Sequence, residues 1–465
     1  MISRRGRSLL TSLLSATFVA IPLVASAIDY TVSSPVGGGV GTCTTTPKSA
    51  TSVAAPDVWG LASDSNGNIW YTDRTNFVIC KLTPDGNVVR VAGTGVRGIG
   101  ADNVQATSSE LYDPISLAVD ANGVLYIGEY SGSRSIRRVG TDGVITTIVN
   151  VAHGSTSTGI GGLATAASST GPTGIAISPS GDVYYSEYGA SRVKMIDSNG
   201  YLQLVAGNGT SGNTGDGGLA TAATLSQIAC ITFDKSGNLY ISSYTHNVRK
   251  VDTAGIITKY AGTYGTNSNT GNGGLATAAT FRYLWGIVTD GVGNLYIPER
   301  GGTSVRKVDA ATGIVTTIAG VDGGSAFADG STSVARFGNT YAVAFTPNGD
   351  LYVSDLTNAR IRKIASVGEM SVAVAPDITF TALNKYRLTS TINASGGASG
   401  KITFYANGKR IPRCISITYT GNYSCSWKPS GRGSISVYAS VLTSSNAVLK
   451  SSPITVGIAS RTTLR

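Results

Sequence analysis

The sequence predicts an all-β protein that consists of a six-bladed β-propeller followed by an Ig-like β-sandwich. A glycine turn that leads into an aromatic strand start, as in Ser236-Gly-Asn-Leu-Tyr-Ile241, occurs six times. Its glycines stand 56 to 58 residues apart. Repeats at a fixed period of this length are typical of solenoids and propellers. The six glycines are Gly67, Gly123, Gly181, Gly237, Gly293 and Gly349.

Each repeat within residues 57–374 can be divided into four short strands. In the fourth repeat, turns at Gly237 and Gly255 join the strands 228–233, 238–242, 247–251 and 256–261. Glycine is favoured at such turns because it adopts positive φ without steric cost. Four antiparallel strands per repeat, six times over, indicate six blades that bury both faces against their neighbours.

The closure of the ring has two interpretations. Residues 369–374 follow Gly368 at the right spacing for the fourth strand of blade six, and we favour this arrangement, with residues 28–34 as an extra cover. Alternatively, residues 369–374 form the first strand of the next domain. The remainder of residues 28–56 is rich in Gly, Ser and Thr and is predicted to be a lead-in loop.

Residues 1–27 have the features of a secretory signal peptide. Arg4, Arg5 and Arg7 form a basic start, residues 9–24 are mostly apolar, and Ala25-Ser-Ala27 is a small-residue cleavage site. We therefore expect cleavage near Ala27 and a secreted, periplasmic or cell-envelope location. No later segment is long enough to span a bilayer, so we expect no transmembrane segment in the mature chain.

Residues 375–465 are predicted to form a basic domain with an Ig-like β-sandwich fold. This stretch contains eleven Lys and Arg and one acid, whereas residues 28–374 have a net charge of −3. About seven short alternating strands fit the strand number of an Ig-like sandwich. The charge favours contact with an anionic envelope polymer, or it only keeps the domain soluble and its edges unpaired. We expect no specific nucleic-acid partner.

Five cysteines in an exported chain indicate disulfides. Cys414 and Cys425 flank a predicted hairpin turn, where they would face each other at bridging distance, and we expect them to pair. A bridge between Cys43 and Cys80 would join the lead-in to blade one. Cys230 stands at the crowded middle of an inner strand and is predicted to be a small buried residue.

An acidic residue closes the second strand in five of the six repeats. One interpretation is a ring of carboxylates for a cation; the other, which we favour, is a repeated bond to an arginine of strand three. No cofactor is predicted, although an interblade loop could hold a structural calcium ion. The five acids are Asp73, Glu129, Glu187, Glu299 and Asp355, and the metal-ligand candidates are Asp216, Glu129, Glu187 and Glu299.

Aromatic and arginine side chains are predicted to gather where the chain enters the inner strands and leaves the second strands. Trp59, Trp285 and Tyr341 precede inner-strand small residues in three blades that are neighbours in a closed ring. Such rings beside arginine suit sugars or flat anionic ligands, although packing between blades is the alternative. The residue after the strand-two acid position completes this candidate ligand site with Arg74, Tyr130, Tyr188, Tyr244 and Arg300.

The repeats resemble the NHL repeat family. Pro172-Thr-Gly-Ile-Ala-Ile177 and Val305-Arg-Lys-Val308 are close to its consensus sequence. The interblade phrase Gly215-Asp-Gly-Gly-Leu-Ala-Thr-Ala-Ala223 is similar to one in bacterial NHL propellers and in the propeller of teneurins. Residues 400–408 resemble bacterial Ig-like repeats. The resemblance implies a fold and, since such propellers mostly serve as binding platforms, a binding role.

Three functions follow from these expectations. The first is an exported, non-enzymatic protein whose propeller face binds a glycan or a protein while the basic domain contacts an anionic surface. The second is a metal-dependent propeller hydrolase or lyase of the lactonase type, and the third is a structural adhesin component. The enzyme is less favoured because His153 and His246 are the only histidines, whereas amidating propeller lyases use several to hold zinc.

Overall fold

We analysed a computed structural model of the chain. The parts of the chain that it describes are residues 30–321, 326–365, 370–375, 386–394, 400–406, 409–415, 421–427, 433–443, 448–450 and 454–458.

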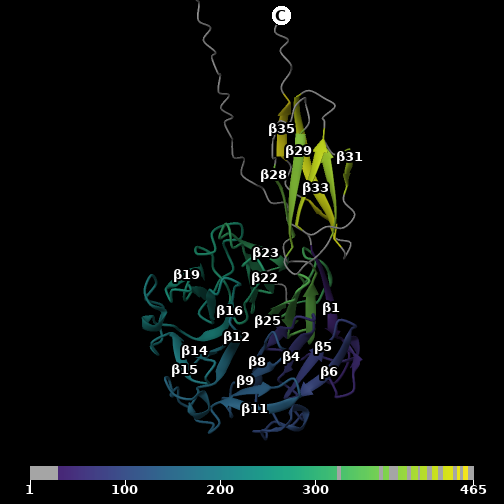
Figure 1. The fold of residues 1–465 in the computed structure, drawn as a ribbon. Coiled ribbons are helices and arrows are strands. Elements are labelled where there is room, and N and C mark those ends of the chain that lie inside the picture. Colours follow the sequence, from purple (N-terminus) through teal and green to yellow (C-terminus); the bar gives the residue numbers. More distant parts are fainter. Residues whose placement is uncertain are drawn as a thin grey trace, which may run out of the picture.

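Six antiparallel sheets arranged in a ring confirm the prediction of a six-bladed propeller (Figure 1). In blades one to five the four main strands follow the chain from the innermost strand outward. Blade one contains β3 (Leu61–Ser63), β4 (Ile69–Asp73), β5 (Val78–Leu82) and β6 (Asn87–Ala92). Blade two contains β8 (Pro114–Val119), β9 (Leu125–Glu129), β10 (Ile136–Val139) and β11 (Val144–Val149). Blade three contains β12 (Pro172–Ile177), β13 (Val183–Glu187), β14 (Arg192–Ile196) and β15 (Leu202–Ala206).

The remaining blades repeat this order. Blade four contains β16 (Ile228–Phe233), β17 (Leu239–Ser243), β18 (Asn247–Val251) and β19 (Ile257–Gly262). Blade five contains β20 (Val288–Thr289), β21 (Leu295–Glu299), β22 (Ser304–Val308) and β23 (Val315–Gly320). Blade six contains β25 (Thr340–Phe345), β26 (Leu351–Asp355) and β27 (Arg360–Ile364).

The fourth strand of blade six comes from the start of the chain, so the favoured assignment of residues 369–374 to this strand is wrong. Strand β1 (Thr31–Gly37) pairs with β27, and Figure 1 shows this purple strand beside the green strands of the last blade. Val32 and Val36 of β1 are buried in the blade. This pairing closes the ring because it gives β27 a hydrogen-bonded neighbour that would otherwise be missing at the edge.

The end of the lead-in is the first copy of the repeated interblade phrase, whereas its residues 38–47 form a loop as predicted. Short 3-10 helices occur at Ala50–Ser52, Ala106–Ser108, Ala164–Ala166 and Ala220–Ala222. The first alanine of each donates its N–H to the carbonyl of an outer-turn glycine, as Ala50 does to Gly86 at 2.9 Å. Ala220 also accepts an N–H from Gly207 of the preceding blade at 2.9 Å. The phrase therefore links consecutive blades.

Three short strands extend the outer edges of the blades that these segments reach. Strand β2 (Lys48–Ser49) pairs with β6, and β7 (Val104–Gln105) pairs with β11. Strand β24 (Gly330–Ser331) pairs with β1. They cover the outermost strands of blades one, two and six, which would otherwise be free sheet edges.

A disulfide joins Cys43 to Cys80 and connects the lead-in to blade one, a pairing that the sequence alone did not assign. Both residues are buried. Cys230 is a free cysteine that lines the central channel and is only partly buried, so its expected burial is incomplete. Burial of its sulfur raises the pKa of the Cys230 thiol.

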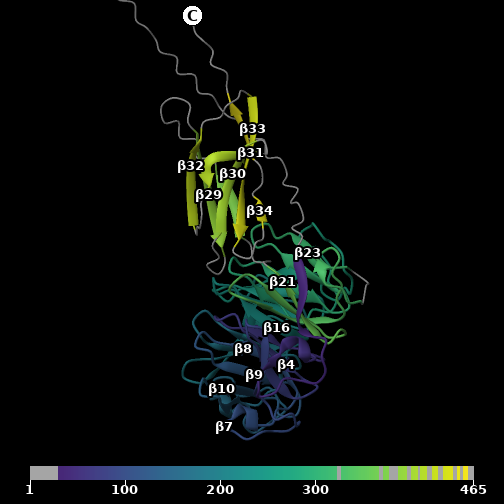
Figure 2. The same cartoon turned by 90° about the vertical axis from the view of Figure 1, so that its right-hand side faces the viewer.

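The strands after residue 370 form further antiparallel pairs (Figure 2). Strands β28 (Met370–Ala375), β29 (Tyr386–Ala394) and β32 (Gly421–Trp427) form one sheet. The other contains β30 (Gly400–Ala406), β31 (Lys409–Ile415), β33 (Gly433–Thr443), β34 (Val448–Lys450) and β35 (Ile454–Ile458). The Ig-like sandwich over residues 375–465 stays a prediction.

The predicted cysteine hairpin and the predicted cysteine bridge have different outcomes. Cys414 lies in β31, which pairs with β30, and Cys425 lies in β32, which pairs with β29, so the expected hairpin between them is wrong. The Cys414–Cys425 bridge itself stays a prediction.

The signal peptide at residues 1–27 lies outside the described residues. Within the described part of the chain, no helix has the length and apolar character needed to cross a membrane.

Candidate functional site

The inner strands enclose a central channel with a cavity volume of about 870 Å³. All six blades line it with their first strands. One end of the lining is formed by Trp59 and Trp285, and the other by residues such as Asp64, Asp234 and Asp290. The three aspartates accept the backbone N–H groups of the turns that follow them, as expected for turn caps.

The three aromatic residues predicted to cluster at the channel mouth do meet there. The ring centroid of Trp59 lies 4.8 Å from that of Trp285 and 4.8 Å from that of Tyr341. However, Trp285 is only 8% exposed and Tyr341 only 4% exposed. Together with Ile115 and Ala229 they form one apolar cluster that spans the ring. The aromatic residues therefore pack on one another and close this end of the channel instead of leaving an open mouth.

Beside this closed end lies a second aromatic group, which we call the tyrosine platform: Tyr130, Tyr188, Tyr244 and Tyr283. All four side chains are half-buried. Tyr244 and Tyr283 are stacked, with centroids 4.8 Å apart and an angle of 30° between the rings. Burial, with the neighbouring phenols of Tyr130 and Tyr244, raises the pKa of Tyr188. The platform thus presents rings from blades two to five around the channel axis.

Tyr283 was missed by the sequence analysis. It stands three residues before Gly286, at a position that carries a different residue type in every blade except the first two. The structure shows that this position is equivalent from blade to blade, because its carbonyl accepts an N–H from the residue after strand two in several blades. Examples are Asp57 with Arg74 at 3.1 Å and Tyr283 with Arg300 at 3.3 Å.

The two predicted arginines border this face and differ in their partners. Arg74 forms ion pairs with Asp57 at 3.4 Å and with Asp113, and its guanidinium lies 4.7 Å from the centre of the Trp59 ring. Arg300 donates to the Tyr244 hydroxyl at 3.1 Å, and its guanidinium lies 4.8 Å from the centre of the Tyr341 ring. Within the described residues, Arg300 has no carboxylate partner.

The acids that close the second strands serve the fold. Four of them accept a backbone N–H from the residue 17 positions earlier, for example Tyr112 to Glu129 at 2.6 Å and Gly338 to Asp355 at 2.8 Å. Cations of strand three approach the same carboxylates: Lys194 to Glu187 at 2.9 Å, Arg306 to Glu299 at 3.6 Å and Arg362 to Asp355 at 2.9 Å. These carboxylates therefore have the internal partners that the favoured interpretation requires.

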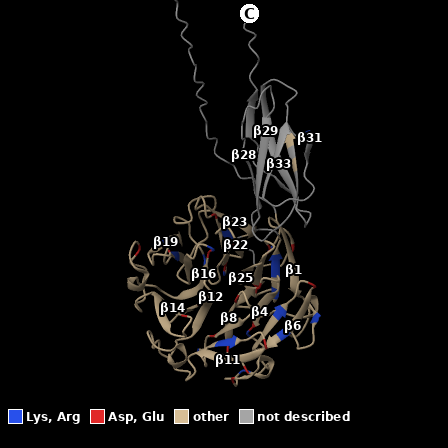
Figure 3. Cartoon of the chain, in the orientation of Figure 1, with Lys and Arg blue, Asp and Glu red and all other residues tan. Residues whose placement is uncertain are grey.

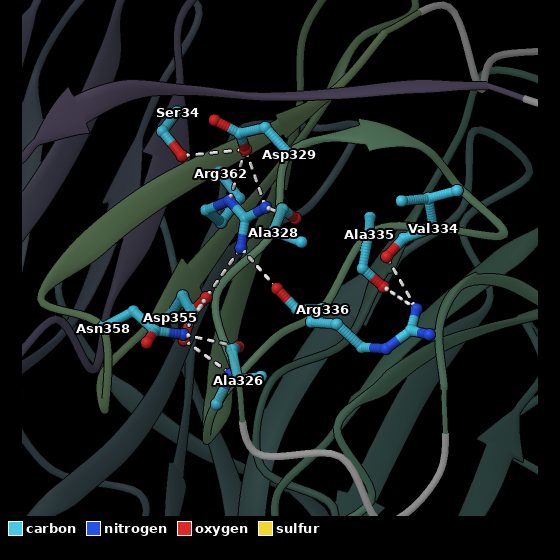
Figure 4. Close-up of polar contacts among 11 residues, drawn as sticks. Ser34, Ala326, Ala328, Asp329, Val334, Ala335, Arg336, Asp355, Asn358 and Arg362 are labelled. Atoms are coloured by element: carbon cyan, nitrogen blue, oxygen red, sulfur yellow. Dashed lines mark hydrogen bonds and ion pairs between the residues drawn. The ribbon is translucent and has the colours of Figure 1, made fainter.

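The strand-three cations also hold the interblade segments. Figure 4 shows Arg362 between Asp355 and Asp329, with a distance of 2.7 Å to the Asp329 carboxylate. Asp216, a metal candidate, contacts Arg249 in the same way at 2.7 Å. Basic and acidic segments accordingly lie on the strands and loops of several blades (Figure 3). In the described part of the chain, no group of three or more His, Cys, Asp or Glu side chains is arranged to hold a metal ion.

Glu129 shows how strongly these carboxylates depend on their partners. It is fully buried, and burial raises its pKa, while the charge of Arg137 and hydrogen bonds from Tyr112, Ser135 and Ser133 oppose the rise. An isolated carboxylate in such a position would be unfavourable in its charged form.

Blade one departs from this pattern, since a cysteine replaces the cation. Cys80 pairs with Tyr71 of β4, as Arg137 pairs with Ile127 of β9, so the two occupy the same place in their blades. Asp73 consequently lacks a strand-three cation and accepts instead from the Thr42 hydroxyl at 2.5 Å and from the Asn76 amide at 2.8 Å. Burial raises the pKa of Asp73.

No protein-family model matches the chain. Teneurin-1 of Gallus gallus is 26% identical over 226 residues, which are 45% of this chain and 8% of that protein. Teneurin-m of Drosophila melanogaster is 29% identical over 174 residues, which are 34% of this chain and 6% of that protein. The chain thus matches less than a tenth of the length of these curated relatives.

Two solved structures from Bacteroides thetaiotaomicron are similar in fold. One, a protein of unknown function, has a TM-score of 0.55 at 18% identity, with 72% of this chain and 75% of that chain covered. The other, an auxiliary nutrient binding protein, has a TM-score of 0.53 at 15% identity, with 72% and 76% covered. At this identity the similarity concerns the fold alone: the chain is an all-β, six-bladed propeller with distant sequence similarity to teneurins.

Proposed function

We propose that the protein is an exported, non-enzymatic binding protein that holds a glycan on the tyrosine platform. The observation that supports this most directly is the group of half-buried rings of Tyr130, Tyr188, Tyr244 and Tyr283 beside Arg300. Tyrosine combines an apolar face, on which the C–H side of a sugar can stack, with a hydroxyl that can bind sugar hydroxyls. A shallow face of this kind suits a chain of sugars lying across several blades.

The setting of the protein agrees with a binding role outside the cytoplasm. Disulfides such as Cys43–Cys80 persist in oxidising compartments. One of the similar structures is described as an auxiliary nutrient binding protein. We extend the proposal to the basic residues 375–465, which would contact an anionic envelope polymer by charge.

Binding is favoured over the metal-dependent hydrolase or lyase because the candidate metal ligands already have internal partners. Glu187 and Glu299 contact buried cations, and Asp216 contacts Arg249. A divalent ion at any of these places would have to displace a cation and separate an interblade segment from its blade. No specific observation favours a purely structural adhesin.

The test is a glycan array with the mature chain, followed by calorimetric titration of the glycans retained. The double substitution Tyr188→Ala and Tyr244→Ala removes two rings of the platform and should weaken binding by at least roughly 10-fold, since each ring contributes on the order of 1 kcal/mol. Tyr201→Ala is the matched control, because Tyr201 is 43% exposed on an outer turn. Unchanged affinity in the double variant would refute the site, and retention of a protein instead of a glycan would refute the ligand class.

A further inference from the structure

Arg74 and Arg300 occupy the same position in their blades, seven residues after the first turn glycine. Each donates its backbone N–H to the same place in its own blade, Arg74 to the carbonyl of Asp57 and Arg300 to that of Tyr283. The backbone groups of the two arginines are therefore anchored at equivalent places, so the side chains around them can be compared.

The neighbours of Arg74 neutralise it. Its two acidic partners are Asp57 in blade one and Asp113 in blade two. These two aspartates occupy equivalent positions, each three residues before the small residue of the inner strand. Arg74 is thus held between the carboxylate of its own blade and that of the next.

The equivalent positions around Arg300 carry neutral residues. Tyr283 replaces Asp57, and Asn339 of blade six replaces Asp113. The correspondence is visible in the backbone: the Asp113 carbonyl accepts from Tyr130 at 3.1 Å, and the Asn339 carbonyl accepts from Leu356 at 2.9 Å. Both acids that neutralise Arg74 are therefore missing beside Arg300.

What remains around Arg300 is aromatic. Its guanidinium lies over the Tyr341 ring at 4.8 Å and 5.9 Å from the Tyr244 ring, and one N–H binds the Tyr244 hydroxyl. A ring face attracts a cation but does not cancel its charge. The remaining N–H groups of the planar guanidinium match the two oxygens of a carboxylate.

We propose that Arg300 forms an anion subsite of the tyrosine platform that selects acidic glycans by pairing with a carboxylate of a uronic acid. This inference rests on the proposed glycan-binding function and specifies its ligand class. The stacked rings of Tyr244 and Tyr283 would hold the sugar ring while Arg300 binds its carboxylate. A sulfate ester offers the same charge and oxygen geometry, and the test distinguishes the two.

The experiment compares affinities of the mature chain for oligouronates, for sulfated oligosaccharides and for neutral oligosaccharides of equal length. Wild-type protein should bind the oligouronates most tightly. Arg300→Gln should weaken their binding by roughly 10- to 100-fold, the usual effect of one hydrogen-bonded charge, and change the affinity for neutral sugars much less. Tighter binding of the sulfated than of the uronic oligosaccharides would overturn the assignment of a carboxylate.

A second variant tests the mechanism without removing any contact of the platform. Asn339→Asp places, at nearly constant shape, a carboxylate at the position in the repeat that Asp113 occupies beside Arg74, and it should lower the affinity for oligouronates by a similar factor. Lys259→Gln is the control for total charge, because Lys259 is exposed on the outermost strand β19. Equal loss in the control, or no loss in either Arg300→Gln or Asn339→Asp, would overturn the subsite.

A glycan-independent measurement separates this inference from the proposed function. Selenate diffused into crystals of the wild-type protein should give an anomalous peak beside Arg300 and none beside Arg74. If no glycan binds but selenate occupies this place, the glycan-binding function is refuted and the anion subsite is supported. If glycans bind through the tyrosines with no preference for acidic sugars and selenate is absent, the subsite is refuted and the platform is supported.

Discussion

Removal of the Cys43–Cys80 disulfide should destabilise the protein substantially. The bridge closes a loop of 37 residues that contains the end of the lead-in and the first two strands of blade one. Because a cross-link restricts the unfolded chain, a loop of this length corresponds to about 4 kcal/mol of stability at 25 °C. The substitutions Cys43→Ala and Cys80→Ala together should lower the free energy of unfolding by about that amount.

The position of this bridge in blade one gives a second reason to expect destabilisation, besides loop length. The Thr42 hydroxyl lies 3.9 Å from each sulfur and donates to the buried Asp73 carboxylate. Asp73 has no strand-three cation, since Cys80 occupies that position. Loosening of the lead-in would therefore also remove a hydrogen bond from a buried carboxylate, which adds to the entropic loss.

The assay is denaturant unfolding followed by tryptophan fluorescence, with the double variant compared with the wild type. Cys230→Ala is the matched control, because Cys230 is a free cysteine of the inner wall and leaves the bridge intact. Since both half-cystines are buried, the native bridge should also resist reducing agent until the protein unfolds. A loss below about 1 kcal/mol in the double variant would refute the reasoning from loop closure.

Two further predictions concern the buried carboxylates. Arg137→Met should lower the free energy of unfolding by roughly 3–5 kcal/mol, because it breaks the ion pair of Arg137 with Asp102 at 3.0 Å and removes the cation whose charge opposes the raised pKa of buried Glu129. The half-buried neighbour Arg138 provides the control substitution Arg138→Met, and equal losses in denaturant unfolding would contradict the prediction. For Asp73, burial raises the folded-state pKa above its ordinary value of 3.8. Its contribution to stability is therefore complete below that value and lost as pH rises through the raised pKa. The stability of Asp73→Asn relative to wild type should accordingly improve from pH 3 to pH 7 in unfolding experiments, and a difference that is constant or shifts in the opposite direction would exclude this mechanism.

The repeat period was sufficient to predict the propeller, because the same turn glycine and the same strand-two aromatic appear in every blade. It was not sufficient to predict how the ring closes. Residues 369–374 have a strand pattern that fits either neighbour, and the pairings of β1 with β27 and of β28 with β29 exclude them from blade six. The copy of the interblade phrase in the lead-in was not predicted, because it is reduced to Ala50-Thr-Ser52. This stretch is too short to be recognised without its hydrogen bond to Gly86.

The sequence predicted which side chains of the candidate site lie together but not how exposed these side chains are. Equivalent positions in adjacent blades bring Trp59, Trp285 and Tyr341 together, and the structure does so. Their packing on one another depends on how far each ring reaches across the channel, which a one-dimensional pattern does not contain. The partners of Arg74 were likewise not predicted, because Asp57 and Asp113 are distant from it in sequence but lie beside it in space.

The positions that are alike in all blades and those that differ have separate roles in this propeller. A shared backbone site must serve the fold six times, so its usual occupant is structural, as with Glu299 beside Arg306 or Asp355 beside Arg362. A ligand that is not six-fold symmetric can be recognised only by side chains that break the repetition. Arg300 with Tyr283 and Asn339 is such a break, since the same three positions in blades one and two hold a neutralised arginine with two aspartates. Departures from the repeat therefore guide the proposal of a binding face better than its consensus does.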